Sequence, residues 1–362
     1  MKNVMIVGGG KIGSAIAQFL AGTADYRVTV ADRDRESLDH IAVHDIERRQ
    51  LFIRDASELA SEIEGQDIVL SATPFSLTPI VAEAAVRAGA HYLDLTEDVE
   101  STRTIREIAR KAKTALIPQC GLAPGFISIA AFDLARKFDR LRDLEMRVGA
   151  LPVFPTNALK YNLTWSTDGL INEYCNPCEA IRDGERLEVP ALEEKEFFSL
   201  DGTEYEAFNT SGGLGTLCDT LEGKVENLNY KTVRYPGHRD VIKLLVRDLR
   251  LGGRREILKD VLETAIPITH QDVVLVFVTA SGWRDGRLTQ ESTARKIYSS
   301  TVDGRPMSAI QITTAAGICA MCDLLVEGKL PQQGFIRQEE ALLSDFLVNR
   351  FGRFYENNGP SS

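Results

Sequence analysis

Residues 4–13 read VMIVGGGKIG, a short apolar run followed by a glycine-rich turn. The run has the composition of a β-strand, and the turn fits the pattern G-x-G-x-x-G through Gly8, Gly10 and Gly13. In this pattern the first glycine permits a tight turn, the second lets the backbone approach a pyrophosphate, and the third lets helix and strand pack closely. A helix that opens near Lys11 would offer its unpaired N–H groups to the phosphates. The stretch therefore predicts a dinucleotide-binding fold.

The acid at the end of the next strand bears on the choice of cofactor. This second strand is expected at residues 27–31 and leads to Asp32. An acid here accepts hydrogen bonds from both ribose hydroxyls and repels a 2′-phosphate. Arg33 follows and could bind that phosphate, although a solvated residue near the adenine is the favoured interpretation. We predict NAD as the cofactor, with NADP as the alternative.

Strands and helices alternate through the first third of the chain. After Asp32 the pattern predicts helices at 36–48, 58–64, 79–88 and 102–113, and strands at 50–53, 67–71, 91–95 and 115–118. This α/β alternation predicts a Rossmann domain, a doubly wound parallel sheet with right-handed crossovers. Ligands bind at the carboxyl ends of the strands in such sheets. Besides the three glycines, the predicted cofactor-binding residues are Lys11, Ile12, Asp32, Arg33, Asp55, Ala56, Thr73, Pro74, Asp94, Thr96 and Gly121.

From about residue 149 the pattern changes to extended segments separated by turns. Strands are expected at 158–164, 196–199, 204–209, 231–235 and 272–279, and helices at 119–138 and 243–249. Asp183-Gly184 and Asp201-Gly202 are typical of tight hairpin turns. The region therefore predicts a central α+β domain with a mixed sheet.

Helical periodicity returns near Thr313, and a last helix is expected at 339–350. We expect these helices to pack back on the nucleotide domain. The predicted organisation is a discontinuous Rossmann domain (residues 1–120 and about 313–362) and a substrate and dimerisation domain (about 121–312). The polar tail at 353–362 is expected to fray.

Composition narrows the class of protein. The chain has 362 residues, of which 44% are hydrophobic and 26% charged, as in ordinary soluble enzymes. A net charge of -10 argues against nucleic acid or an anionic membrane as a partner. Apolar runs fall short of the roughly 20 residues that span a bilayer, and the N-terminus leads directly into the first strand. We expect a cytoplasmic protein without a signal peptide.

Six cysteines include two C-x-x-C pairs, Cys175/Cys178 and Cys319/Cys322. Four such cysteines can bind zinc where the fold joins the pairs. However, the second pair lies in the apolar run 318–326, which is typical of a buried helix, where cysteine acts as a small hydrophobe. Plain thiols and no metal site are therefore predicted.

Five motifs carry a family resemblance: GGGKIG at 8–13, GLAPG at 121–125, LTWS at 163–166, INEY at 171–174 and RYPGH at 234–238. Together they resemble the saccharopine dehydrogenase superfamily, most closely its L-lysine 6-dehydrogenase branch. The first motif is generic, whereas the last three together are fairly specific. The glutamate-forming saccharopine enzymes carry an acid within Gly-Leu-x-Pro-Gly, where this chain has Ala123. This departure favours the lysine enzyme.

The resemblance implies an NAD-dependent oxidative deamination. L-lysine, NAD and water would yield 2-aminoadipate 6-semialdehyde, ammonia and NADH. It also implies a homo-oligomer, most simply a twofold dimer. The first alternative is an oxidoreductase of the saccharopine dehydrogenase type, acting on a secondary amine. The second, from another class, is a regulatory protein that binds NAD(H) without turnover.

The reaction needs a neutral amine, because an ammonium has no lone pair to assist hydride loss. Deprotonating a free lysine side chain at neutral pH costs roughly 4 kcal/mol, so a base is expected. His238, in the turn Tyr-Pro-Gly-His, is the leading candidate, and Lys160 and Glu173 are the other catalytic candidates. A structural role for this histidine is the alternative.

The segment around Trp165 is dense in polar side chains suited to a diamino acid. Glu173 or Asp168 could hold an ammonium, and Arg234 could pair bidentately with an α-carboxylate. In the alternative interpretation the charges are on the surface and Trp165 is core. The predicted substrate-binding residues are Tyr161, Trp165, Asp168, Asn172, Arg234 and Tyr235.

Overall fold

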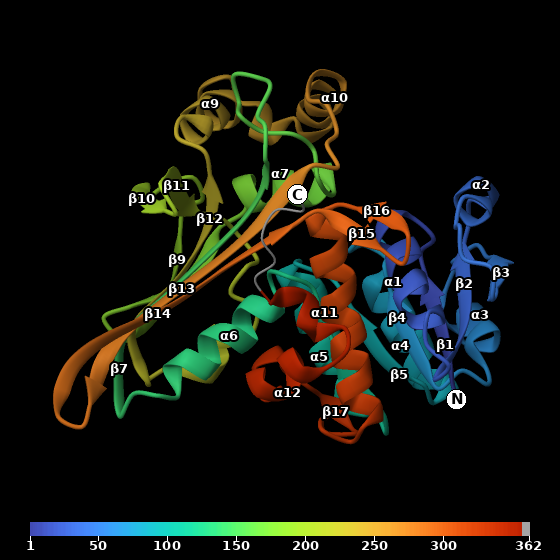
Figure 1. Cartoon of the computed structure of the whole chain (residues 1–362). Coiled ribbons are helices and arrows are strands. Elements are labelled where there is room, and N and C mark those ends of the chain that lie inside the picture. The colour runs from blue at the N-terminus through green and yellow to red at the C-terminus, as the bar shows by residue number, and fades with distance from the viewer. Residues whose placement is uncertain (357–362) are drawn as a thin grey trace. The chain divides into compact units, whose positions relative to one another are not determined.

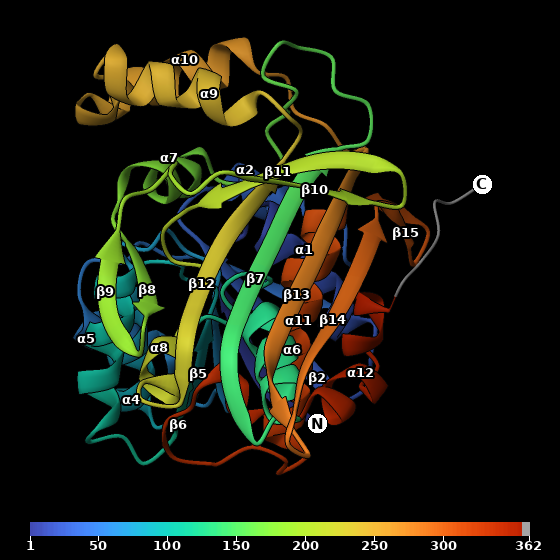
Figure 2. The same ribbon diagram turned by 90° about the vertical axis from the view of Figure 1, so that its left-hand side faces the viewer.

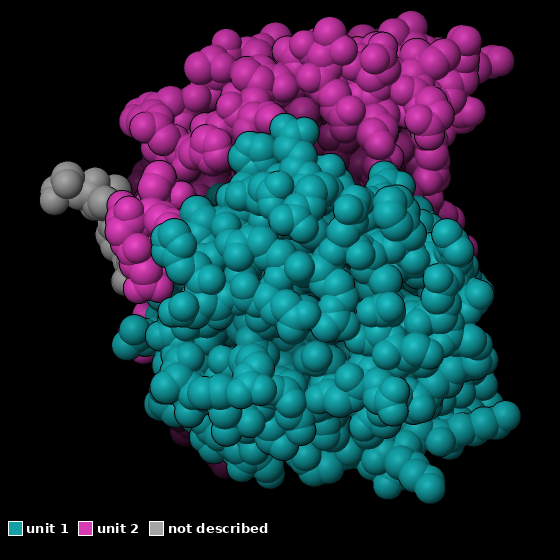
Figure 3. All heavy atoms as spheres, turned by 90° about the vertical axis from the view of Figure 1, so that its right-hand side faces the viewer, with its two compact units in different colours: residues 1–129, 311–354 teal, residues 130–310, 355–362 magenta. Residues whose placement is uncertain are grey.

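The computed structural model describes residues 1–356, and these fall into two compact units. Unit 1 comprises residues 1–129 and 311–354, and unit 2 comprises residues 130–310 with Tyr355 and Glu356 (Figure 3). The sequence analysis placed the two boundaries near residues 120 and 313. Residues 357–362 were predicted to belong to the Rossmann domain and to fray. These residues lie outside the part of the chain that the structure describes.

Unit 1 is built on a seven-stranded parallel sheet (Figure 1). Its order is β17 (Gly334–Phe335), β6 (Ala115–Ile117), β5 (His91–Asp94), β4 (Ile68–Ser71), β1 (Lys2–Val7), β2 (Tyr26–Asp32) and β3 (Ile46–Gln50). From β6 to β3 this is the order of the doubly wound fold, which reverses direction between β1 and β4. The predicted Rossmann arrangement is confirmed, and β17 extends it by a strand from the far end of the chain.

Helices cover this sheet, and capping side chains define where several of them begin. The helical elements of unit 1 are α1 (Lys11–Ala21), α2 (Arg35–Asp39), α3 (Ala56–Ile63), α4 (Thr78–Ala88), α5 (Val99–Ala109), η3 (Gln338–Glu340), α12 (Leu343–Val348) and η4 (Gly352–Tyr355). Asp34, Asp55 and Asp98 accept hydrogen bonds from the first-turn N–H groups of α2, α3 and α5.

Helix α11 (Ala309–Val326) is the one described helix that is long and apolar enough to cross a membrane. Its mean hydropathy is 1.7, but 83% of it is buried inside the protein, which is the behaviour of a core helix. Its two cysteines are buried, as expected. By length and composition this helix comes close to a membrane span, so the prediction that apolar runs fall short of one was wrong here.

Two predicted elements of unit 1 were displaced. The helix expected at 36–48 ends at Asp39, and the strand expected at 50–53 is β3 at Ile46–Gln50. Arg48 of β3 explains why the chain leaves the helix early. Its guanidinium donates to the carbonyl oxygens of Leu38 (3.1 Å) and Ile41 (2.8 Å), which a longer helix would have used.

Unit 2 contains an eight-stranded mixed sheet, as predicted (Figure 2). Its path is β10 (Glu196–Leu200), β11 (Thr203–Asn209), β12 (Val225–Arg234), β7 (Arg140–Pro152), β13 (Asp272–Arg284) and β14 (Arg287–Tyr298), and β8 (Cys178–Arg182) and β9 (Glu185–Val189) branch from β12. Among these pairs β12 and β7 run parallel, and the others are antiparallel. A separate hairpin joins β15 (Ser300–Val302) to β16 (Arg305–Met307).

Tight Asp-Gly turns close four hairpins of unit 2. At Asp183-Gly184, Asp201-Gly202, Asp285-Gly286 and Asp303-Gly304 both residues have φ between 49° and 83°. Two positive φ values define the type I′ turn, whose twist matches paired strands. The two turns that the sequence analysis named are confirmed, and the same dipeptide marks the two that it missed.

Unit 2 contains helices at both ends of its sheet. They are α7 (Thr167–Cys175), α8 (Leu217–Leu221), α9 (His238–Lys243), the π-helical turn η1 (Leu244–Asp248), the short η2 (Leu251–Gly253) and α10 (Arg255–Ala265), and α6 (Phe126–Ala135) begins in unit 1. Helix α8 comes just before the start of β12, and α9 comes just after its end. In Figures 1 and 2, α9 and α10 lie together beyond the end of β12. Tyr161, Phe208 and Leu258 belong to the apolar core beneath them.

Four further predictions were wrong in extent. The strand expected at 158–164 is irregular chain, in which Lys160 has a left-handed backbone (φ 51°). The helix expected at 119–138 is a turn followed by α6, because Gly125 has φ 135° and no room for a Cβ. The helix expected at 243–249 is the end of α9 and the π turn, and the one at 339–350 is broken into η3 and α12.

Candidate functional site

The glycine turn after β1 has the shape of a phosphate cradle. Gly8 has φ 108°, and a Cβ there would lie 2.6 Å from the carbonyl oxygen of Ala72. A Cβ on Gly13 would lie 1.8 Å from the carbonyl oxygen of Gly8. At Gly10, by contrast, nothing lies within 4 Å of an added Cβ. The turn is therefore closed on the protein side and open where a ligand would approach the start of α1.

A cavity of about 470 Å³ lies at this open side, within unit 1. Helix α1 begins at Lys11 without a side-chain cap, so its first N–H groups can receive a phosphate. The lining fits the phosphate and adenosine half of a dinucleotide, and two of the predicted residues, Gly10 and Lys11, are in it. The lining residues are Gly9, Gly10, Lys11, Ser14, Asp34, Glu36, Ser37, His40, Ile41 and Gln311.

Asp32 braces the glycine turn with its carboxylate. One oxygen accepts from the Gly9 N–H (2.6 Å) and the other from the Asp34 N–H (2.8 Å). Asp34 in turn accepts from Ser37, and these hydrogen bonds hold the pKa of Asp34 below its usual range. The floor of the cavity is thus acidic, with Glu36 beside these two residues.

Other predicted cofactor residues have structural partners. Asp55 is exposed and caps α3 through the N–H groups of Ser57 (2.8 Å) and Glu58 (2.9 Å), and Ala56 is buried. The Arg33 carbonyl accepts from the Gln50 side chain. The cofactor roles of Asp55 and Ala56 stay predictions.

Carboxyl groups cluster where β5 ends. Asp94 is buried, and one of its oxygens accepts from the N–H groups of Thr96 (2.9 Å) and Gln119 (3.0 Å). This ties the end of β5 to the turn that contains Gly121. Burial raises the pKa of Asp94 to about 6, and burial with the nearby Asp98 and Asp94 charges raises the pKa of Glu97 to about 7.

Glu97 was not among the predicted site residues, although Glu97 comes shortly after the predicted Asp94 and Thr96 at the end of β5. A carboxyl group with a pKa near 7 can accept and release a proton at neutral pH. On the neighbouring strand, the hydroxyl of the predicted Thr73 pairs with that of Ser71 at 2.9 Å.

In unit 2, Arg234, Tyr174 and His238 form a buried hydrogen-bonded cluster. Arg234 donates through Nε to the Tyr174 hydroxyl (3.1 Å) and through Nη1 to the Val233 carbonyl (2.8 Å). Its guanidinium carbon lies 4.9 Å from the centroid of the Tyr161 ring. The cluster joins a predicted carboxylate-binding arginine to two aromatic rings, Tyr161 and Tyr174, of which Tyr174 was not among the predicted substrate-binding residues.

His238 is held in a way that does not suit the predicted general base. Its Nδ1 lies 2.9 Å from the Leu159 carbonyl, which only accepts, so Nδ1 carries the proton. Its Nε2 then accepts from the Tyr174 hydroxyl at 3.0 Å. Burial and the Arg234 charge lower the pKa of His238 to about 3. The ring is therefore neutral, with both nitrogens engaged by protein groups.

Some of the remaining predicted residues join this cluster and others do not. Lys160 donates to the Pro236 carbonyl at 3.0 Å, beside the turn that leads to His238. Glu173 is buried one residue before Tyr174. Asp168 instead pairs with Lys259 at 2.7 Å in an exposed ion pair, and the Tyr235 hydroxyl donates to the Pro152 carbonyl in a separate apolar cluster. Trp165 is partly buried and packs on the core of unit 2.

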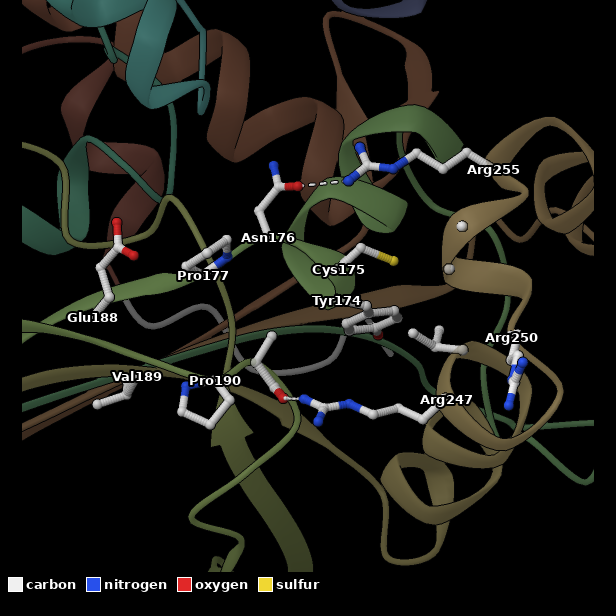
Figure 4. A pocket seen from close by; sticks show the side chains of 14 residues that line it. Tyr174, Cys175, Asn176, Pro177, Glu188, Val189, Pro190, Arg247, Arg250 and Arg255 are labelled. Atoms are coloured by element: carbon white, nitrogen blue, oxygen red, sulfur yellow. Dashed lines mark hydrogen bonds between the residues drawn. The ribbon is translucent and has the colours of Figure 1, made fainter.

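A second cavity, of about 620 Å³, lies wholly within unit 2 (Figure 4). Its lining brings three arginines from residues 247–255 near Tyr174 and Cys175. The predicted Asn172 reaches this place indirectly, because its side-chain oxygen accepts from Arg255 at 2.6 Å. The lining residues are Tyr174, Cys175, Asn176, Pro177, Glu188, Val189, Pro190, Ala191, Val246, Arg247, Arg250, Gly252, Gly253 and Arg255.

The cysteines give no sign of a metal centre. All six lie within the described residues and are free thiols. Within residues 1–356 no group of three or more His, Cys, Asp or Glu side chains is arranged to hold a metal ion.

Two family models match the chain in sequence. The saccharopine dehydrogenase NADP binding domain matches residues 4–117, and the saccharopine dehydrogenase C-terminal domain matches residues 121–354. The first match coincides with the glycine turn and the strands β1 to β6. The second takes in the whole of the Arg234 cluster and the arginine-lined cavity.

Individual relatives are distant. Saccharopine dehydrogenase (NADP+, L-glutamate-forming) of Saccharomyces cerevisiae is 25% identical over 259 residues, which cover 68% of this chain and 57% of that protein. Mitochondrial alpha-aminoadipic semialdehyde synthase of Rattus norvegicus is 22% identical over 199 residues, which cover 52% of this chain and 21% of the relative. The aligned part of the chain thus spans 57% of the first of these relatives and 21% of the second.

A solved structure shares the fold. Apo saccharopine dehydrogenase (L-Glu forming) from Saccharomyces cerevisiae superposes with a TM-score of 0.78 at 17% identity, covering 96% of this chain and 97% of that chain. At this identity the likeness is one of fold.

Proposed function

Because the chain belongs to the saccharopine dehydrogenase family, as the match over residues 121–354 shows, we propose that it oxidises a carbon–nitrogen bond of an amino acid with a nicotinamide dinucleotide. The observation that carries this proposal is the phosphate cradle at Gly8–Gly13 with its cavity in unit 1. The first candidate reaction is the oxidative deamination of L-lysine, in a cytoplasmic enzyme. A bound nicotinamide would supply the hydride acceptor.

NAD is the proposed cofactor, although the yeast relative is named for NADP+. Asp34 and Glu36 place two carboxylates in the cavity lining, and Asp32 adds a third carboxylate that hydrogen-bonds to the lining residues Gly9 and Asp34. Such a charge favours ribose hydroxyls and repels a 2′-phosphate. Lys11 lies at the phosphate end, beside the start of α1, where the pyrophosphate of either cofactor would bind.

The chain's own residues would bind and deprotonate the amine. Arg234 is buried with a donor fork partly engaged by Tyr174, and it is the proposed partner of the substrate α-carboxylate. His238 keeps the Tyr174 hydroxyl oriented, so we assign it a positioning role in place of the predicted base role. Lys160 and Glu173, which flank this cluster, stay proposed catalytic residues.

Proton uptake is assigned to Glu97. Its carboxyl group lies at the ligand-binding end of the parallel sheet, and its pKa of about 7 allows it to be ionised in much of the protein at neutral pH. Raising the pKa of a carboxyl group brings it closer to that of the amine and reduces the cost of proton transfer between them.

Saccharopine is the second candidate substrate, because the yeast relative carries that name. Purified protein with NAD should form NADH with one amine from a panel of L-lysine, L-ornithine and saccharopine. Ammonia release with lysine supports the first candidate, whereas glutamate release from saccharopine replaces it with the second. Tight NAD binding without turnover of any amine would instead support a regulatory dinucleotide-binding protein.

Cofactor choice can be tested at Asp32. Asp32→Asn keeps an acceptor for the Gly9 N–H but removes the charge, so kcat/KM with NAD should fall about tenfold relative to kcat/KM with NADP. The Glu64→Gln variant, a substitution that removes a charge outside the cavity lining, is the control and should keep the wild-type ratio. A wild type that already prefers NADP would contradict the assignment.

A further inference from the structure

The cavity of unit 2 has a positive lining that the proposed reaction does not use. Arg247, Arg250 and Arg255 contribute three guanidinium groups, and Glu188 contributes the one carboxylate among the lining residues. With a volume of about 620 Å³, the cavity has the size of a small-molecule site. The positive charge of the lining favours an anionic ligand, and the volume of the cavity limits that ligand to a small molecule.

Neutral groups hold Arg255 in place and leave its charge available. Its two terminal nitrogens donate to the side-chain oxygens of Asn172 (2.6 Å) and Asn176 (2.6 Å). Amide oxygens orient the guanidinium fork without neutralising it. The site is therefore organised before a carboxylate arrives, which reduces the entropy lost on binding.

The other two arginines differ in how they are held. Arg247 donates to the Ala191 carbonyl at 2.8 Å and lies 3.8 Å from Glu193, which offsets part of its charge. For the Arg250 side chain, the described part of the chain provides neither a hydrogen bond nor an ion pair. The Arg250 side chain can therefore reorient toward a ligand without breaking a hydrogen bond or an ion pair within the described part of the chain.

Unusual backbone conformations also occur in the segment that lines this cavity. The π-helical turn η1 carries Arg247, and such turns are rare and often found at functional sites. Arg250 follows with a left-handed backbone (φ 57°), a conformation unfavourable for a residue with a Cβ. Helix α10 then begins at Arg255 without a side-chain cap, which adds the positive end of its dipole.

The walls between the arginines are largely apolar. Figure 4 shows Arg255 above and Arg247 below Tyr174 and Cys175. Val189, Pro190 and Val246 complete this part of the lining. Separated cations on either side of an apolar wall suit two anionic groups joined by a short hydrocarbon body better than a single compact anion.

We propose that this cavity binds a small aliphatic dicarboxylate, with one carboxylate at Arg255 and the other at Arg247 and Arg250. The binding belongs to unit 2 and does not rest on the proposed reaction. Tyr174 lines the cavity and also hydrogen-bonds to Arg234 and His238, so an occupied cavity would adjoin the buried cluster.

Isothermal titration calorimetry of the whole protein tests the site, with glutarate and adipate as the probes. Acetate and inorganic phosphate, at matched ionic strength, are the comparison ligands. The dicarboxylates should bind, and Arg250→Gln and Arg255→Gln should each weaken their binding about tenfold. Arg254→Gln is the matched control, because this neighbouring exposed arginine does not line the cavity, and its affinity should equal that of the wild type.

Three results would overturn the proposal: no dicarboxylate binding, tighter binding of phosphate or acetate than of either diacid, or equal weakening in Arg254→Gln. Arg250→Gln decides the matter where Arg255→Gln disturbs the fold, because Arg250 holds no neighbouring side chain. No turnover is measured, so an enzyme inactive with every amine leaves this test intact.

Discussion

At the scale of single residues, burial and hydrogen bonding decide what a titratable group can do. His238 and Glu97 have ordinary pKa values of about 6.5 and 4.3. In the folded chain burial moves them in opposite directions, because it disfavours the charged imidazolium and the charged carboxylate alike. The histidine thus becomes a neutral positioning group, and the carboxyl group becomes able to exchange a proton near neutral pH.

Glu97 should control the acid side of the pH–rate profile. Only its carboxylate form can accept a proton, so kcat/KM should rise as the pH increases through about 7. Glu97→Gln should lower kcat/KM at least about a hundredfold and remove this rise. Glu100→Gln, at an exposed position on α5, is the control. An unchanged profile in Glu97→Gln would reject the assignment.

His238 should make stability depend on pH. Its folded pKa of about 3 lies below the unfolded value, so the unfolded chain binds a proton that the folded chain rejects. The stabilisation is complete above pH about 6.5 and is lost as the pH falls toward 3; at pH about 5 the loss is about 2 kcal/mol. The free energy of unfolding, measured by urea titration, should differ less between pH about 7.5 and pH about 5 in His238→Gln than in the wild type.

His238→Gln also removes a hydrogen-bond partner of Tyr174, so it lowers the free energy of unfolding at both pH values. The quantity to compare is therefore the change in that free energy between the two pH values. Equal pH dependence in wild type and variant would show that folding does not lower the pKa of His238.

At the scale of elements, short polar signals define where helices and hairpins begin. Asp-Gly closes four hairpins, and aspartates cap three helices of unit 1. Helix α11 differs, because its cap comes from a distant strand. The buried Asp272 of β13 accepts from the N–H groups of Ala309 (2.6 Å) and Ile310 (3.0 Å).

Removing this cap should destabilise the protein. Asp272→Ala removes the two hydrogen bonds from Asp272 to the start of α11, at a cost of about 2–3 kcal/mol, and Asp272→Asn should cost less because it retains one acceptor. The measurement is the free energy of unfolding in urea. Asp285→Asn, in an exposed hairpin turn that asparagine also fits, should change it by less than about 0.5 kcal/mol. Equal effects at the two positions would contradict the capping role.

At the scale of the whole molecule, assembly is the open prediction. The family resemblance suggests a homodimer, and the wide mixed sheet of unit 2 offers a surface for it. Light scattering at micromolar concentration should give twice the chain mass of 40.0 kDa. A particle of one chain mass, independent of concentration, would refute the dimer.

The sequence by itself determined the local architecture of this protein. The spacing of Gly8, Gly10 and Gly13 predicts the phosphate cradle because only glycine fits the close approaches at Gly8 and Gly13, and Gly10 leaves the turn open to a ligand. Alternating strands and helices predict the parallel sheet, and Asp-Gly predicts the hairpins, since both depend on backbone preferences within a few residues. The boundary at β3 was missed because the Arg48 side chain reaches back seven to ten residues to the carbonyl oxygens of Ile41 and Leu38, a contact that helical periodicity does not reveal.

Only the tertiary structure decided which polar side chains meet. Tyr174, Arg234 and His238 come together from segments about 60 residues apart, whereas the predicted Asp168 finds Lys259 on the surface. The arginine-lined cavity likewise joins α7, the end of β9 and the start of α10. Such meetings depend on how elements pack across the core, and burial then sets the pKa and role of each group. Residue type and spacing along the chain carry neither piece of information.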